Sequence, residues 1–470
     1  MSRINTNVSS LIAQRVLKKN NDQLNQSLER LSTGLKINSG ADNPAGLIAS
    51  ENLRAEQTGI TTAIDNAGRA SNIIGTAEGG LSEVSSLLTE LQGLVGQTAN
   101  SGGLSTEEKQ ANQLQVDSIL GTINRIAQAT SFQGKKLLNG NYGYTSSSVT
   151  ASKIANLSIN AARVPDASAV AVVVEVTTSA NTGKITHTGS VAGGNVTLEI
   201  AGNTGTEQLS FASGTTVSSV ATAINSVSTA TGVSASVSGA YVVFNSQEYG
   251  SDQFVSVKTV ATTGTASFTT SAATSSGRDA AVTVNGAKAD AHGLSISYRS
   301  SNLDVEFDLA TANNLAGTTT FGVTGGGATF SLGSKVTEAD KASIGIQSVS
   351  TGSLGNSTLG FLSSLASGQV NSLTGTNLVD AQKIVDKGIK QVSQLRGRLG
   401  AFQKFTIGST VNSLGVAYEN ASAAQSAIRD TDFAQETSNL TRAQILSQAA
   451  STVLAQANSA PQAALALLRG

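Results

Sequence analysis

The chain has 470 residues, enough for several domains, and only 13% of them are charged, with a formal net charge of −1. A balance so close to neutral excludes binding to nucleic acid or to an anionic membrane by charge alone. The absence of cysteine excludes disulfides and thiolate metal sites, and the two histidines, His187 and His292, are too far apart in the chain to form a helical metal pair.

Residues 1–20 lack the charged and then apolar layout of a secretory signal, because Asn5, Asn7 and Gln14 interrupt the apolar runs. The longest apolar run, residues 169–174, is far shorter than the roughly 20 residues that span a bilayer. We therefore expect no membrane span, and an export route that does not use a cleaved signal peptide.

Residues 4–35 are predicted to form a helix with apolar side chains on a spacing of three and four. Its leucines are the expected contacts of an inner coiled coil: Leu17, Leu24, Leu28, Leu31 and Leu35. Burial of so few apolar side chains would not offset the conformational entropy lost when the whole segment becomes ordered. Our hypothesis is that this helix is frayed in the monomer and orders only against other helices.

A second, much longer helix is predicted from Pro44, with Asn43 as its N-cap, to about Thr98. Between residues 60 and 95 its apolar residues repeat at coiled-coil spacing: Ile74, Ala77, Leu81, Val84, Leu88, Leu91 and Val95. A second apolar edge runs beside this seam: Ile73, Leu87 and Leu94. Apolar heptads are usually intramolecular core, so it is the second edge that favours packing against a neighbouring helix or subunit.

The next elements are a helical hairpin and a β-hairpin. Ser105 and Glu108 form a predicted capping box at the start of a helix that extends to about Thr130. We expect this helix to pack antiparallel to the long one. Residues 132–144 are predicted to form a β-hairpin around the turn sequence Asn139-Gly140.

From about residue 151 to residue 375 the composition changes to Thr, Ser, Gly, Ala and Val, with the alternation typical of short strands. One short helix, Val217–Val227, interrupts the strands. The turn sequence Asn285-Gly286 and the alternating apolar residues of segment 303–309 predict a second block of strands. We expect two small β domains, residues 151–275 and 276–375.

Helix returns at about Asn377, and Leu395, Leu399 and Phe402 belong to its predicted packing seam. Several glycines weaken this helix, which predicts that close packing holds it: Gly388, Gly397, Gly400, Gly408 and Gly415. Asp430 to Asp432 interrupt it, and Asp432 caps a last helix. The expected inner coiled-coil residues of that helix are Leu446, Val453, Leu454, Leu465 and Leu468.

These elements predict a multidomain α+β fold, with long coiled-coil rods from both chain ends and inserted β-rich outer domains. The predicted rod-packing residues are Ile73, Ile74, Leu81, Val84, Leu87, Leu88, Leu91, Leu94, Leu395, Leu399 and Phe402. The predicted domains are an N-terminal inner helix and linker (1–43), a helical rod with β-hairpin (44–150), the two β domains, a C-terminal rod (376–430) and a C-terminal inner helix (431–470).

Both chain ends resemble bacterial flagellins. The N-terminal resemblance lies in residues 28–38, Leu-Glu-Arg-Leu-Ser-Thr-Gly-Leu-Lys-Ile-Asn, with Asp42 and Ala45-Gly46. At the other end, residues 428–434 and 454–458 are similar to the flagellin C-terminus, and residues 215–233 resemble the flagellin hook repeat. Paired signatures of this kind are highly specific.

The resemblance implies a structural filament subunit that is not an enzyme, whose terminal helices pair as an inner coiled coil. It implies an extracellular protein of the bacterial flagellum, exported unfolded, that forms a homopolymer. Its implied partners are an export chaperone, the filament-cap protein and the hook-filament junction protein. Where flagellins usually present an Arg to the vertebrate Toll-like flagellin receptor this chain has Glu90, although Leu94 matches, which argues against recognition by that receptor.

Three alternatives stay open at this point. A hook-filament junction protein would share the terminal coiled coils, and an adhesive or receptor-binding module on a helical stalk would share the outer β domains. Asp304, Glu306 and Asp308 fall on one strand face, where they predict either a calcium site or a solvated surface. No His-Glu-x-x-His zinc motif and no Ser/His/Asp arrangement can be placed in the sequence, so we expect neither an enzyme nor a cofactor.

Overall fold

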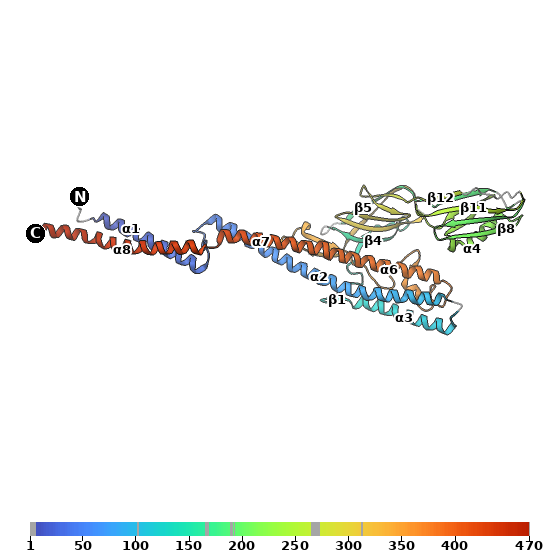
Figure 1. The fold of residues 1–470 in the computed structure, drawn as a ribbon, viewed down its shortest axis with the longest axis horizontal. Coiled ribbons are helices and arrows are strands. Elements are labelled where there is room, and N and C mark those ends of the chain that lie inside the picture. The colour runs from blue at the N-terminus through green and yellow to red at the C-terminus, as the bar shows by residue number, and fades with distance from the viewer. Residues whose placement is uncertain are drawn as a thin grey trace. The chain divides into compact units, whose positions relative to one another are not determined.

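The computed structural model describes residues 6–100, 103–164, 169–188, 191, 193–264, 273–311 and 314–469, without the side chains of residues 188 and 460–469. The chain divides into two compact units. The terminal unit contains residues 1–69, 331–340 and 407–470, and the central unit contains residues 70–330 and 341–406. Figure 1 labels the elements along the chain.

Helix α1 (Val8–Thr33) opens the terminal unit, with the Asn7 side chain accepting a hydrogen bond from the Ser10 amide at 3.0 Å. The helix ends because Gly34 adopts a left-handed conformation at φ 74° and its amide bonds back to Arg30. The predicted extension to residue 35 is therefore wrong: Leu35 lies beyond the helix, where it forms an isolated β-bridge with Asp430.

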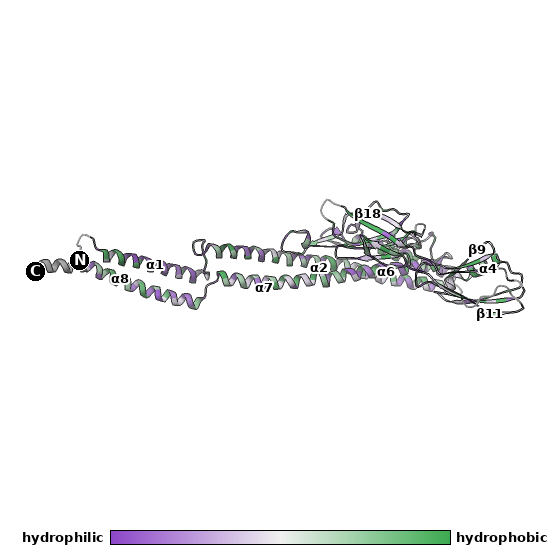
Figure 2. Ribbon diagram, turned by 90° about the horizontal axis from the view of Figure 1, so that it is seen from above, coloured by the Kyte–Doolittle hydropathy of each residue, from purple (hydrophilic) through white to green (hydrophobic). Residues whose placement is uncertain are grey.

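Helix α8 (Phe433–Arg469) closes the chain, and α1 lies alongside it in both ribbon views (Figures 1 and 2). Its first turn is capped as predicted, because the Asp432 carboxylate accepts hydrogen bonds from the amides of Ala434 and Gln435 at 2.9 and 3.1 Å. The terminal unit also contains α7 (Ser409–Arg429), where Arg429 pairs with Glu51 at 3.0 Å.

Helix α2 (Pro44–Ala99) has the predicted start, because the Asn43 side chain accepts from the Gly46 amide at 2.9 Å. Helix α3 (Thr106–Ala129) begins with the predicted capping box of Ser105 and Glu108, in which both hydrogen bonds are present. An Asn112 to Thr98 hydrogen bond of 3.2 Å joins the two helices near the turn between them. The close approach of Gly80 to Thr130 at the other end of α3 makes the pair antiparallel, as expected.

The β-hairpin after α3 is shorter than predicted. Strand β1 (Ser131–Phe132) pairs with β2 (Lys135–Lys136), so the turn residues are Gln133 and Gly134, both at positive φ. Two consecutive positive φ values suit a two-residue primed turn, which matches the twist of the flanking strands. The Asn139-Gly140 turn predicted for this hairpin lies beyond it, and there the Asn139 side chain accepts from the Asn141 amide.

The inner lobe of the central unit has two antiparallel sheets around one apolar core. One sheet has the order β14-β13-β5-β18-β3, and the other has β15-β16-β17-β4. The strand bounds are β3 (Tyr144–Ser147), β4 (Ile154–Ala162), β5 (Val170–Thr178), β13 (Ala281–Val284), β14 (Ala287–Lys288), β15 (Asp290–His292), β16 (Ser295–Arg299), β17 (Leu303–Leu309) and β18 (Gly317–Gly326). The alternation predicted on β17 is confirmed, because Leu303, Val305, Phe307 and Leu309 are buried.

The outer lobe has a separate apolar core between a four-stranded sheet, β12-β11-β7-β8, and a three-stranded sheet, β6-β10-β9. Its elements are β6 (Lys184–Thr188), β7 (Val196–Gly202), β8 (Thr206–Phe211), α4 (Val217–Ser226), α5 (Ser228–Thr231), β9 (Val233–Ser238), β10 (Tyr241–Ser246), β11 (Phe254–Thr262) and β12 (Ala273–Ser276). The helix predicted at residues 217–227 is α4, whose Val220, Ala221 and Ile224 enter this core.

The two β domains predicted from the sequence are therefore nested rather than consecutive. Strand β5 pairs with β13, and strand β4 pairs with β17, so residues before and after the outer lobe share the inner core. The outer lobe is inserted between β5 and β13, so the boundary predicted between residues 275 and 276 falls at its C-terminal end, in β12. The prediction that β4 and β5 belong to the same domain as the outer lobe is wrong. Composition changes little between the lobes, and only strand pairing reveals the insertion.

Short elements connect the inner lobe to the helices: β19 (Ala328–Ser331), η2 (Glu338–Asp340), β20 (Lys341–Ile344), β21 (Gly355–Asn356), β22 (Gly360–Phe361) and η3 (Leu362–Leu365). Helix α6 (Leu378–Ala401) then packs antiparallel to α2, with an Arg396 to Glu78 ion pair of 2.8 Å and a Gln92 to Asp386 hydrogen bond of 2.8 Å. Segment η4 (Phe402–Gly408) is π-helical and was not predicted.

Candidate self-assembly surfaces

Helices α1 and α8 meet along a seam with alternating steps of three and four residues, the spacing of a coiled coil. The seam residues of α1 are Ser10, Ala13, Leu17, Asn20, Leu24, Ser27 and Leu31, of which Ser10, Ala13, Asn20 and Ser27 are fully buried. Those of α8 are Glu436, Leu440, Ala443, Ser447, Ala450, Leu454 and Ala457. Small and polar side chains thus occupy the most buried positions between the two helices.

Polar contacts fix the register of this helix pair. The buried Asn20 amide donates to the Leu446 carbonyl at 3.0 Å, and the Asn7 amide donates to the Ala457 carbonyl at 2.7 Å. Further contacts join Ser10 to Asn458, Asn21 to Ser447, and Arg30 to Glu436. A sliding of one helix along the other would leave the buried Asn20 side chain without its acceptor, which costs on the order of 1–3 kcal/mol.

Large apolar side chains lie on the outward faces of the same two helices. Nine of them are between 43% and 63% exposed: Val8, Leu11, Ile12, Val16, Leu28, Phe433, Ile445, Leu446 and Val453. Figure 2 shows apolar stretches in green beside polar ones in purple along α1 and α8. The pair therefore keeps its most apolar surface outside and its small and polar residues inside, the reverse of an independent coiled coil.

The structure divides the leucines predicted for the inner helices into groups. Leu17, Leu24, Leu31 and Leu454 lie in the seam and are half-buried, whereas Leu28, Leu446 and Val453 point outward. Leu35 lies off the helix, and the side chains of Leu465 and Leu468 fall outside the described part of the chain.

Sequence reasoning missed the buried Ser10, Ala13, Asn20 and Ser27, as well as the outward Ile12 and Val16. The signal that could have found the seam is the seven-residue period of Leu17, Leu24 and Leu31, with small or polar residues midway between them.

The rod-packing residues of the central unit are mostly core. Ile74, Leu81, Val84, Leu88, Leu91, Leu395 and Leu399 are buried. Of the second edge, Leu94 is also buried at 6% exposure, whereas Ile73 and Leu87 are only half-buried. Phe402 is half-buried too, with its ring centroid 6.0 Å from that of Phe330.

The glycines of α6 and α7 differ in their surroundings. A side chain at Gly388 would come into ordinary contact with Leu362 at 3.5 Å, so close packing exists there as predicted. At Gly397, Gly400 and Gly415 a Cβ would meet nothing within 4 Å. The expectation that the chain itself packs closely on these three glycines is therefore wrong.

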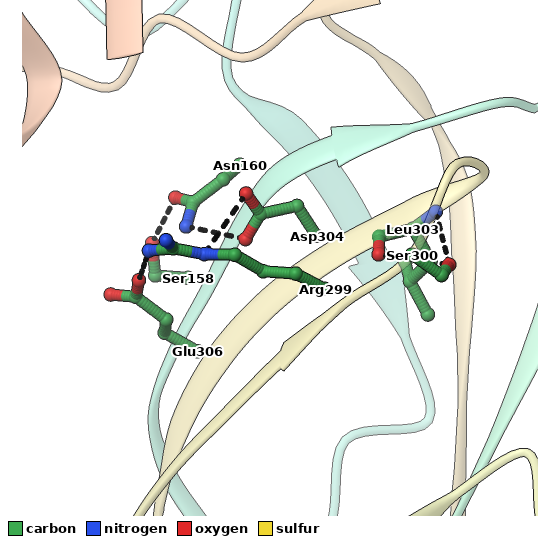
Figure 3. Close-up of polar contacts among 7 residues, drawn as sticks. All are labelled: Ser158, Asn160, Arg299, Ser300, Leu303, Asp304 and Glu306. Carbon is green, nitrogen blue, oxygen red and sulfur yellow. Dashed lines mark hydrogen bonds and ion pairs between the residues drawn. The ribbon is translucent and has the colours of Figure 1, made fainter. Parts of the chain in front are cut away.

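The three carboxylates of β17 are bound by protein groups, and Figure 3 shows two of them, Asp304 and Glu306. Arg299 pairs with Asp304 at 3.6 Å and with Glu306 at 3.0 Å, and the Asn160 amide donates to Asp304 at 3.1 Å. Asp308 accepts hydrogen bonds from Ser295 and Asn156. Burial lowers the pKa of Arg398 on α6, and the charges of Glu306 and Asp304 oppose this effect. Among the described residues, no group of three or more His, Cys, Asp or Glu side chains is arranged to hold a metal ion.

None of the described helices is long and apolar enough to cross a membrane. Three family models match the chain. Residues 4–143 match the bacterial flagellin N-terminal helical region, and residues 382–468 match the bacterial flagellin C-terminal helical region. Residues 197–247, which span β7 to β10 in the outer lobe, match the flagellin hook IN motif.

Similar proteins match over nearly the full length. Flagellin B of Vibrio cholerae and polar flagellin F of Vibrio parahaemolyticus are each 31% identical, with 99% of both chains covered. The solved structure of FliC from Burkholderia pseudomallei is 16% identical over 71% of this chain and 99% of that chain, with a TM-score of 0.24, too low to carry a structural argument. From the family models and the full-length relatives, the chain belongs to the bacterial flagellins, the structural subunits of the flagellar filament.

Proposed function

We propose that α1 and α8 are the principal polymer contacts of this filament subunit and that they become fully ordered only on assembly. The observation that carries this proposal is the inversion of the α1–α8 pair, whose large apolar side chains face outward. A pair of helices can remove such a surface from water only against other helices. Each side chain that becomes fully buried contributes roughly 1.5–3 kcal/mol to assembly.

The predicted inner-helix residues take two roles in this proposal. Leu28, Leu446 and Val453 pack between subunits, whereas Leu17, Leu24, Leu31 and Leu454 pack within the α1–α8 pair. Leu35, Leu465 and Leu468 remain predicted contacts of the polymer. Because the seam buries mainly small and polar side chains, the pair gains little apolar burial in the monomer, which supports ordering at the growing tip.

The proposal includes how the subunit reaches the filament. The chain is exported unfolded to the extracellular flagellum, with an export chaperone before export and the filament-cap and junction proteins as neighbours afterwards. Its role is structural, without catalysis or a cofactor. Helices that order only against neighbours suit this route, because they leave few stable contacts to break before export.

The test compares seeded polymerisation of the full chain, a variant lacking residues 1–35, Leu11→Asp and Gln14→Asp. Leu11 and Gln14 are both exposed on α1, so the control adds the same charge to a polar position. We expect the truncation and Leu11→Asp to yield no long filaments by electron microscopy, while Gln14→Asp polymerises normally.

Far-ultraviolet circular dichroism should show that the β lobes stay folded in all four proteins. Filaments from the truncated chain would end the proposal.

A further inference from the structure

The outer lobe is attached to the inner lobe by two short connections, residues 179–183 after β5 and residues 277–280 before β13. The two apolar cores have no buried residue in common among those described. Beside the connections lies a hollow of about 610 Å³, lined by Ala180, Asn181, Lys184, Tyr249, Asn314 and Leu315. One apolar contact does cross the joint, because Tyr249, in the loop after β10, is partly buried against the inner core. The two cores are otherwise separate, so polar contacts must help to fix the angle between the lobes.

Backbone hydrogen bonds hold the two connections together. Asn181 and Arg278 form an isolated antiparallel bridge with N–H to O distances of 2.8 and 2.9 Å. The outer-lobe loop between β10 and β11 joins them, because the Gly250 amide donates to the Asn181 carbonyl at 3.3 Å and the Gly277 amide donates to Gln253 at 2.7 Å. The joint thus consists of two connections and one loop.

One carboxylate reaches both lobes at this joint. Asp279 Oδ1 accepts from the Ser251 amide of the outer lobe at 3.0 Å and from the Gly293 amide of the inner lobe at 2.7 Å. Asp279 Oδ2 accepts from the Ser251 hydroxyl at 2.5 Å. The hydrogen bond from the Ser251 hydroxyl is the largest cause that lowers the pKa of Asp279, and the other hydrogen bonds lower it further. The carboxylate is therefore charged at neutral pH.

Glycine allows the backbones to touch around this carboxylate. A Cβ at Gly250 would lie 3.0 Å from Gly293 Cα, and a Cβ at Gly293 would lie 2.4 Å from the Tyr249 carbonyl oxygen. A Cβ at Gly277 would lie 2.4 Å from the Gly250 carbonyl oxygen. Both distances of 2.4 Å are closer than real Cβ atoms come to other atoms, so the joint admits no side chain at Gly277 or Gly293.

We propose that Asp279 and this glycine contact form a clamp that locks the outer lobe against the inner lobe. The carboxylate ties together amides from the two lobes, and the glycines let those amides approach. Without the clamp, the two connections act as a flexible hinge, and the outer lobe swivels while both cores stay folded. This inference concerns the inserted lobes and does not depend on the polymer contacts of α1 and α8.

The absence of native cysteine makes the clamp measurable in the full chain. Glu207→Cys on β8 and Lys288→Cys on β14 place one spin label on each lobe at exposed positions. Pulsed electron spin resonance then gives the distribution of distances between the lobes. We expect a narrow distribution in the labelled parent and roughly doubled width in Asp279→Ala, because alanine removes the oxygen that accepts from both amides. Asp279→Asn keeps one acceptor oxygen and should widen the distribution less.

Two matched controls separate the clamp from general effects. Asp252→Asn removes the same charge from an exposed neighbouring position and should leave the width unchanged. Gly293→Ala and Gly239→Ala both place alanine at a positive φ near 62°, but a Cβ at Gly239 meets nothing within 4 Å. Only Gly293→Ala should widen the distribution.

An unchanged width in Asp279→Ala would overturn the proposal. Hydrogen exchange of β7 and β17 checks that both cores remain folded in each variant. Loss of protection in either core of Asp279→Ala would also overturn it, because the carboxylate would then serve folding of a lobe rather than the joint.

Discussion

Asp42 organises the loop between α1 and α2 through its side chain. Its carboxylate accepts hydrogen bonds from the Ser39 amide at 2.8 Å, the Ser39 hydroxyl at 3.1 Å, the Asn38 amide at 3.2 Å and the Gln26 side chain at 3.1 Å. The Ser39 amide is the largest cause that lowers the pKa of Asp42 below its usual 3.8. Because folding lowers the pKa of Asp42, its carboxylate stabilises the folded loop at pH values above the pKa of the unfolded chain. This stabilisation is lost as the pH falls through the pKa of the folded chain.

We predict that Asp42→Asn loosens this loop. Loss of hydrogen bonds to a charged acceptor, discounted for solvent screening, should cost about 1 kcal/mol and raise exchange of the Ser39 amide about five-fold. In the parent chain, protection relative to the intrinsic rate should fall as pH drops below about 4, whereas the variant should show little pH dependence. Hydrogen exchange mass spectrometry of residues 36–43 measures both effects.

The control for this prediction is Asp22→Asn, which removes a carboxylate from an exposed position on α1. It should leave the loop unchanged. Equal protection of the loop in Asp42→Asn and the parent across this pH range would show that the backbone alone holds its shape.

At the scale of elements, replacing either of two helix glycines by alanine should change stability in opposite directions. Gly397 lies within α6, where a Cβ would meet nothing within 4 Å, and Gly34 ends α1 at φ 74°. Gly397→Ala should stabilise the monomer by up to about 1 kcal/mol, because alanine loses less entropy in a helix. Gly34→Ala should destabilise α1 by about 1–2 kcal/mol, because alanine is strained in the left-handed region.

Thermal unfolding followed by circular dichroism checks this pair, with the α1–α8 transition resolved by hydrogen exchange of residues 8–33. The two changes in stability need not be equal in size, but Gly397→Ala must raise stability and Gly34→Ala must lower it. A Gly397→Ala variant that melts below the parent would mean that the glycine already contacts something that an added methyl group displaces.

Sequence patterns predicted the helices better than their contacts. The α2 seam was found because its positions are nearly all large and apolar, so spacing and burial coincide. In α1, the positions of the leucines did not identify the buried face of the helix, because Leu28 lies outward while Asn20 and Ser27 are buried. Burial there depends on the partner helix and its hydrogen bonds, which hydropathy along a single helix cannot reveal.

The β region shows a second limit. Turn chemistry located the Asn285-Gly286 hairpin, but the same reasoning placed the turn of the hairpin after α3 at Asn139-Gly140. The structure has that turn at Gln133-Gly134, and glutamine is an uncommon residue at positive φ. Nesting of the outer lobe depends on pairing between strands more than 100 residues apart, such as β5 with β13. Local alternation carries no information about which strands pair.

At the scale of the whole molecule, the second edge of α2 separates folding from assembly. Leu94 belongs to the core of the central unit, whereas Leu87 is half-buried and keeps part of its apolar side chain exposed. A charge at Leu94 would be buried without a partner, but a charge at Leu87 can reach water. Substitution at Leu87 therefore tests a surface that a neighbouring subunit would cover, and substitution at Leu94 tests a surface that the chain itself covers.

We predict that Leu87→Asp folds as a monomer, with unfolding free energy lowered by no more than about 1–2 kcal/mol, but gives far fewer filaments than the parent. Leu94→Asp should lose about 3 kcal/mol or more of unfolding free energy and fail at the folding step.

Ser86→Asp, which adds the same charge at an exposed neighbour, is the control. Thermal unfolding of monomers and sedimentation of seeded polymers measure the two steps separately. A Leu87→Asp yield equal to that of Ser86→Asp would place this edge in solvent in the filament, because an unpaired carboxylate inside a subunit contact would weaken assembly.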